Sequence, residues 1–229
     1  MLFWIIFIGT LVIGLWAQVR VKRTFAEFSQ VRAHNGMSGR QVAAHILEDA
    51  GIRDVEIRSQ RGHLTDHYDP IRKRLVLSED NYHGTSIAAI AVSAHECGHA
   101  LQHQQSYGPL KLRMASVGIT QFANGALTWI MIGGLFMGLI PFKVALPLLA
   151  LCWGVIMTFN LVTLPVEFDA SHRAKRVLGR LGFTQTSTEE TGVSKVLGAA
   201  ALTYVAAFIT SMAWLLYYIL PFITGGSDD

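Results

Sequence analysis

Charged side chains are scarce in this chain, and their absence is localised. Asp, Glu, Lys and Arg make up 15% of the 229 residues, whereas a typical soluble domain has about 25%. Four stretches carry none of them, namely residues 2–19, 114–142, 144–166 and 196–227. Each is long enough to cross a bilayer, which takes about 20 apolar residues. The pattern argues against a soluble globular protein and predicts four transmembrane helices.

Cysteine is also scarce, with one residue at Cys97 and one at Cys152. The two lie in unrelated segments, and the compartment inferred below is reducing, so we expect no disulfide. A cleaved signal peptide is not expected either, because no positive residue precedes the first apolar stretch and no small-x-small site follows it. Its positive residues come after it, which indicates an uncleaved anchor with the N-terminus outside.

The basic residues fall into two segments. All but one of the 19 Lys and Arg residues lie in 20–113 and 173–195, and the exception is Lys143 between the second and third spans. Four spans place both segments on one side, which the positive-inside rule makes cytoplasmic. We therefore expect a multi-pass protein of the cell membrane with both termini outside, including the tail 224–229.

The basic balance points to lipid and away from nucleic acid. The sequence pI is near 9.0. Basic segments on the cytoplasmic side of a membrane protein, where they contact anionic lipid, account for this value. No basic patch is interleaved with aromatic residues in a recognisable fold, so we expect no nucleic-acid partner.

The most informative motif is the H-E-x-x-H sequence from His95 to His99, in an uncharged and helix-compatible context. Helix positions four apart lie on one face, so both histidines can reach one Zn²⁺ ion. Glu96 projects beside them, where it can take a proton from a Zn-activated water, as in a zinc metalloprotease. Cys97 points well away from both histidines, and we expect a small packed residue there.

A catalytic zinc site usually has three protein ligands and one open position. His103 lies about 12 Å along the helix axis from His95, too far to share the ion comfortably. The metzincin pattern requires Gly and His where this chain has Gln102 and Gln105, so that class is excluded.

The best candidate for the third ligand follows the third span. We expect a helix to start at Pro165 and to carry Glu167, and a glutamate on a second helix downstream of H-E-x-x-H is the gluzincin arrangement. Asp169 and His172 are the alternatives. Asp169 is two residues on and faces roughly the opposite side, so the two acids cannot both point at the metal.

The charged segment around the motif is expected to be small. A capping box at Ser38 predicts a helix to about Ala50, and the zinc-motif helix should run to about Gln105 and end at Gly108-Pro109. Between them we expect a turn at 66–70 and short strands at 55–58, 62–65 and 72–78. This order resembles the N-terminal half of zincin proteases, and we nominate residues 75–77 as the strand that binds substrate backbone.

The expected fold class is a mainly α membrane protein with four transmembrane helices and a small α+β zincin-like cytoplasmic part. The segments are an anchor at 1–19, the zincin-like part at 20–113, a transmembrane hairpin at 114–166, a cytoplasmic helix with the third ligand at 167–195, and a last transmembrane helix at 196–223.

Five short segments together resemble the YugP-like family of neutral zinc metallopeptidases, which are bacterial integral membrane proteins: 65–70, 77–78, 86–89, 94–102 and 164–171. The resemblance covers essentially the whole chain and implies a zinc-dependent membrane peptidase. A more distant similarity is to the HtpX-like and CAAX-prenyl membrane proteases. There an aspartate follows the glutamate ligand by four residues, whereas this chain has Ser171, which can take part of that role.

The expected function is a zinc-dependent membrane endopeptidase that acts on a peptide or a membrane protein, by analogy in quality control. The metal ligands are His95, His99 and Glu167, and Glu96 is the general base. The donor to the oxyanion is expected to be one of four residues: His172 is the catalytic candidate, and Arg173, Tyr82 and His83 are the alternatives.

Two other classes of protein remain open. One is a non-enzymatic zinc-dependent scaffold or regulator of a membrane complex, since little soluble mass surrounds the site, and this leaves room for a membrane-protein partner or a homo-oligomer. The other is a zinc transporter, which is disfavoured because the spans carry no charged residue at membrane depth.

Overall fold

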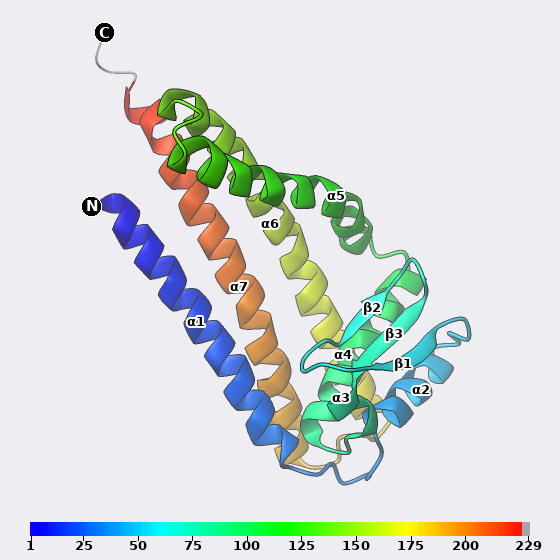
Figure 1. Ribbon diagram of the computed structural model, residues 1–229. Coiled ribbons are helices and arrows are strands. Elements are labelled where there is room, and N and C mark those ends of the chain that lie inside the picture. Colours follow the sequence, from blue (N-terminus) through cyan, green and yellow to red (C-terminus); the bar gives the residue numbers. More distant parts are fainter. Residues whose placement is uncertain (226–229) are drawn as a thin grey trace. The chain divides into compact units, whose positions relative to one another are not determined.

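The structure is a computed structural model that describes residues 1–225 (Figure 1). The chain divides into two compact units. The first consists of Met1–Ala17, Leu112–Leu164 and the chain from Thr203 onward, and the second of Gln18–Lys111 and Pro165–Leu202. From residue 226 on, the tail that we expect outside the membrane lies beyond the described residues.

Four helical segments are long and apolar enough to cross a membrane. They are α1 (Leu2–Ser29), α5 (Gly108–Trp129) with its π-helical continuation η1 (Ile130–Phe136), α6 (Phe142–Arg180) and α7 (Ser187–Thr224). The predicted fold class, a mainly α membrane protein with a small α+β part, is confirmed.

Aromatic packing and hydrogen bonds from an asparagine side chain join α6 to α7 in the first unit. Trp153 of α6 stacks on Trp214 of α7 with ring centroids 5.9 Å apart. Asn160 of α6 donates hydrogen bonds to the carbonyl oxygen of Ala207 at 3.2 Å and to Oγ of Ser211 at 3.0 Å. Such bonds satisfy an amide that would otherwise face hydrocarbon, and they join α6 to α7.

The second unit contains a three-stranded sheet in the order β1-β3-β2. The strand β1 (Glu56–Gln60) runs parallel to β3 (Arg74–Ser78), and β2 (His67–Asp69) runs antiparallel to it. Leu75 and Leu77 are fully buried in a core that also holds residues of α2 (Gly39–Asp49) and α4 (Ile87–Gln104). The central strand is thus paired on both edges and packed on the helices.

This pairing corrects one prediction. Residues 75–77 were nominated to bind substrate backbone, but Leu75 pairs with Ile57 on one side and with Tyr68 on the other. A strand with both edges occupied cannot accept another strand. The free edges of the sheet belong to β1 and β2.

The second strand also differs from the prediction. Residues 62–65 form no strand, and β2 lies in the segment that was predicted to be a turn. The carboxylate of Asp66 accepts hydrogen bonds from the backbone N–H of Ser78 and from Nδ2 of Asn81. These contacts hold the segment against the end of β3, and Asp69 then closes the turn by accepting from the backbone N–H groups of Ile71 and Arg72.

The helix at Ser38 is confirmed. Ser38 accepts from the backbone N–H of Gln41 while the Gln41 side chain accepts from that of Ser38, so the capping box is complete and α2 ends at Asp49. The short helix α3 (Glu79–His83) then leads to α4, which Ser86 caps by accepting from Ala89.

One predicted helix boundary is confirmed and one is wrong. The helix α4 ends at Gln104, one residue from the predicted end, although Gly108 and Pro109 open α5 instead of closing α4. Pro165 does not start a helix, because α6 runs unbroken from Phe142 to Arg180. Proline removes one backbone N–H from a helix, and long apolar helices tolerate this loss when neighbouring groups satisfy the freed carbonyl.

Candidate metal centre

Three side chains from two helices converge in the second unit. His95 and His99 project from α4, and Glu167 projects from α6; one potential ligand atom of each lies within 4.8 Å of the others. Oε2 of Glu167 is 3.2 Å from Nε2 of His95 and 3.6 Å from Nε2 of His99. All three side chains are largely buried, and Glu167 is only 2% exposed.

A glycine allows the two helices to approach this closely. A Cβ atom added at Gly98 would lie 2.5 Å from the carbonyl oxygen of Ala170 and 3.1 Å from its Cα. No side chain fits in that space, so the backbone of α4 packs directly on the backbone of α6. Because Gly98 lies between the two histidines in the sequence, this contact fixes the distance between them and Glu167.

Glu167 lies just past the charge-free stretch that ends at Val166. Its surroundings in the cluster favour the ionised form of its carboxyl group. Burial acts to raise the pKa of this carboxyl group, but the hydrogen bond with His95 and the nearby ring of His99 outweigh burial and hold the pKa well below its ordinary value. A buried carboxylate facing two imidazole nitrogens is the donor set that Zn²⁺ accepts in catalytic sites. The three residues therefore fit the ion.

The other imidazole nitrogen of His95 also has a partner. Its Nδ1 lies 3.2 Å from Oγ of Ser171, which is one helical turn after Glu167 on α6. Metal-bound histidines usually make a second contact of this kind. Ser171 thus contacts one proposed ligand from the helix that carries another.

The rival third ligands are engaged elsewhere. Asp169 forms an ion pair with Arg173. His172 is exposed, and its Nε2 accepts a hydrogen bond from Arg176 at 2.6 Å. His103 lies beside Tyr68, with Nδ1 2.9 Å from the phenol oxygen. The structure brings none of these residues into the cluster of three donors.

Glu96 and Cys97 occupy the middle of the motif. Glu96 is 7% exposed and directly follows His95 in α4. Cys97 is fully buried, and its Sγ lies 3.7 Å from the carbonyl oxygen of Ala43, to which it can donate. Burial raises the pKa of the Cys97 thiol well above its usual value, which keeps it protonated and unsuited to metal ligation.

The four candidates for oxyanion stabilisation make other contacts. Tyr82 packs against His83 and lies under the guanidinium of Arg40. Arg173 donates to Asp169 and to Oε1 of Gln105. Together with the exposed position of His172, these contacts do not select one residue for the role.

Two residues, one in contact with His99 and one on β2, were not predicted from the sequence motifs. Gln102 is fully buried, and its amide lies 3.0 Å from Nδ1 of His99; its spacing of three residues from His99 is the one local hint. Tyr68 lies on the edge strand β2, and burial with the nearby charges of Asp54 and Asp69 raises its pKa to about 12. Its hydroxyl is therefore a protonated donor at neutral pH.

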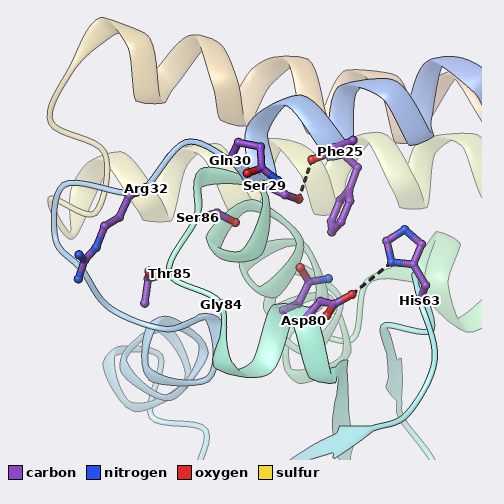
Figure 2. Close-up of a pocket in the computed structure, with 11 residues that line it drawn as sticks. Phe25, Ser29, Gln30, Arg32, His63, Asp80, Gly84, Thr85 and Ser86 are labelled. Atoms are coloured by element: carbon purple, nitrogen blue, oxygen red, sulfur yellow. Dashed lines mark hydrogen bonds and ion pairs between the residues drawn. The ribbon is translucent and has the colours of Figure 1, made fainter.

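A cavity of about 540 Å³ lies at a different place in the second unit (Figure 2). Its lining includes Phe25, Arg32 and the His63–Asp80 pair, whose nitrogen and oxygen lie 3.4 Å apart. None of the three metal donors lines this cavity. The metal centre is thus separate from it.

Two imidazoles one turn apart with a buried carboxylate from a second helix form an arrangement typical of zinc hydrolases. The chain belongs to the family described as "Putative neutral zinc metallopeptidase", which matches residues 3–223. It is 44% identical over 229 residues to the "Putative membrane protease YugP" of Bacillus subtilis (strain 168), covering 100% of both chains. No solved structure matches the chain. The family membership supports a protease in general terms.

Proposed function

We propose that the protein is a zinc-dependent endopeptidase of the membrane, with His95, His99 and Glu167 as metal ligands. The observation that carries the proposal is the convergence of these three donors within 4.8 Å, from helices whose motif residues lie about 70 positions apart in the chain. The family and its YugP relative support the same class of activity.

A zinc ion held there would polarise the scissile carbonyl and lower the pKa of the attacking water towards about 7. His95, His99 and Glu167 would hold the ion, and a catalytic zinc site of this kind would leave one position for water or substrate. Glu96 takes the proton from the attacking water and delivers it to the leaving amine.

We propose β2 as the strand that binds substrate backbone. It is an edge strand, so its outer N–H and C=O groups can pair with an extended peptide. The contact between Tyr68 of β2 and His103 of α4 supports this assignment, because His103 lies one turn beyond His99 on the helix that carries the motif.

We propose further that the centre faces the cytoplasm close to the membrane surface. The charge-free stretch ends at Val166 and Glu167 follows directly, while the basic segments 20–113 and 173–195 favour the cytoplasmic side. A site in this position suits membrane proteins and their exposed loops as substrates.

The direct test is casein cleavage by the purified full-length protein in detergent or lipid nanodiscs. We expect cleavage by wild type, loss after chelation, and recovery when zinc is restored. Glu96→Gln should retain zinc but lose at least about 100-fold in rate, because general-base catalysis contributes about 10²–10⁴-fold. Full activity of Glu96→Gln with zinc bound would contradict the mechanism, and zinc binding without cleavage by any variant would favour a scaffold.

A further inference from the structure

A fully buried glutamine connects the two helices of the metal centre. Oε1 of Gln102 lies 3.0 Å from Nδ1 of His99 on the same helix. Its Nε2 lies 2.7 Å from the backbone oxygen of Val166 and 2.8 Å from Oδ2 of Asp169, both on α6. One side chain therefore contacts a proposed ligand on α4 and the residues on either side of the proposed ligand on α6.

The partners on α6 determine which way the amide points. A backbone carbonyl oxygen can only accept a hydrogen bond, and Oδ2 of Asp169 also acts as an acceptor, since Nε of Arg173 donates to the same atom. The NH₂ group of Gln102 must therefore face Val166 and Asp169, since it is the donor end of the amide. The carbonyl end of Gln102 is left to face His99.

This orientation determines the tautomer of His99. The carbonyl oxygen of Gln102 has no hydrogen to give, so Nδ1 of His99 must donate. A neutral imidazole has one N–H, and with that hydrogen on Nδ1 the lone pair is on Nε2. Nε2 is the atom that faces Oε2 of Glu167, at 3.6 Å.

We propose that Gln102 is a positioning residue of the metal centre, which holds His99 in the Nδ1–H tautomer with Nε2 ready to bind the ion. Burial enforces the arrangement, because turning the amide over would place its carbonyl against two acceptors in a site without water contact. The Arg173–Asp169 pair holds the second acceptor in place.

His95 differs from His99 in this respect. Its Nδ1 partner is the hydroxyl of Ser171, which can either donate or accept. Ser171 therefore orients the His95 ring but does not determine its tautomer. The hydrogen-bond partner of Nδ1 therefore determines the tautomer of His99 but not that of His95.

The inference rests on the proposed zinc centre, and its test does not need proteolysis. Zinc affinity is measured on the purified full-length protein by competition with a chromophoric chelator. Gln102→Met keeps the length of the side chain and removes both the donor and the acceptor. We expect its zinc affinity to fall about 10- to 100-fold, the range typical of a lost outer partner of a ligand histidine.

Gln104→Met is the matched control, because it makes the same change on the same helix at an exposed side chain whose amide donates to Ala50. Its zinc affinity should stay within about 3-fold of wild type, and Ser171→Ala should fall between the two variants. Unchanged zinc affinity in a folded Gln102→Met protein would overturn the proposal.

A second measurement, made on wild type alone, tests the tautomer of His99 directly. Nitrogen-15 spectra of the imidazole rings in the metal-free protein at pH 8 should show the hydrogen of His99 on Nδ1, with His99→Gln used to assign the signal. Finding that hydrogen mainly on Nε2 would overturn the proposal even if Gln102→Met failed to fold. A wild type that binds no zinc would contradict the proposed function, while the ring spectrum would still decide the tautomer.

Discussion

At the scale of single residues, three carboxylates that are buried or half-buried connect separate segments of the second unit. Removing a carboxylate from water disfavours its charge unless donors surround it. Glu167 has two imidazoles as partners, and Asp66 has the groups at the end of β3. Glu189, in the first turn of α7 and ahead of the charge-free stretch, is 3% exposed and accepts from the backbone N–H groups of His34, Gln185 and Thr186.

Glu189 gives a prediction with a defined pH dependence. Burial acts to raise its pKa, but the hydrogen bonds it accepts outweigh burial and lower the pKa. Its stabilisation is therefore complete above the unfolded pKa of about 4.3 and is lost as the pH falls through the lower folded value. Glu189→Gln should cost about 1–2 kcal/mol of unfolding free energy at pH 7.

The measurement is thermal unfolding of wild type and Glu189→Gln in detergent from pH 7 to pH 3. The gap between the two unfolding temperatures should be constant above about pH 5 and should narrow below pH 4. Glu190→Gln, at the neighbouring exposed position, is the control and should show little gap. A gap for Glu189→Gln that widens in acid would contradict the assignment.

At the scale of elements, the centre depends on how closely α4 and α6 pack. Gly98→Ala adds a Cβ 2.5 Å from the carbonyl oxygen of Ala170, so one backbone must shift. We expect this to move His95 and His99 away from Glu167, to lower zinc affinity at least about 10-fold and to cost about 1–3 kcal/mol in stability. Ala100→Gly, on the same helix, adds no atoms and should bind zinc nearly as wild type does.

Zinc titration and thermal unfolding of both variants would check this prediction. Wild-type zinc affinity in Gly98→Ala would mean that the contact between the helices does not set the geometry of the donors.

The elements that could be predicted from the sequence are those with a local signal. The apolar helices follow from charge-free runs, and α2 follows from the capping box at Ser38. The strand β2 could not be found in this way, because its three residues are held by pairing with β3 and by Asp66. The continuity of α6 through Pro165 was also missed, since a proline near the end of a span normally signals a helix boundary.

In the candidate site, too, the residues with a local sequence signal could be predicted and the others could not. His95, Glu96 and His99 form one local motif, and Glu167 could be nominated because a glutamate on a second helix downstream of that motif is the gluzincin arrangement. Gln102 could not be recognised, because its partners on α6 are 64 and 67 positions away in the sequence. Contacts across that distance are set by tertiary packing and leave no spacing pattern.

At the scale of the whole molecule, the proposed topology places the metal centre on the cytoplasmic side. Ile71 is 87% exposed in the second unit and Leu139 is 72% exposed between the second and third spans. Both native cysteines are buried, so wild type serves as the blank. A membrane-impermeant maleimide should label Leu139→Cys in intact cells and Ile71→Cys only after the cells are permeabilised.

The labelling is read on the purified protein. Labelling of Ile71→Cys in intact cells, with Leu139→Cys protected, would reverse the orientation and put the centre outside. If permeabilisation increased the labelling of both variants, residues 71 and 139 would both lie on the cytoplasmic side. That result would contradict a membrane span between them.

The central claim is that Glu167 completes a zinc site with His95 and His99. The measurement that tests it most directly is the zinc-to-protein ratio of purified wild type, Glu167→Ala and His172→Ala, by elemental analysis. We predict about one zinc per chain in wild type and in His172→Ala, and almost none in Glu167→Ala, because two imidazoles alone bind the ion weakly. Zinc retained by Glu167→Ala and lost from His172→Ala would contradict the account.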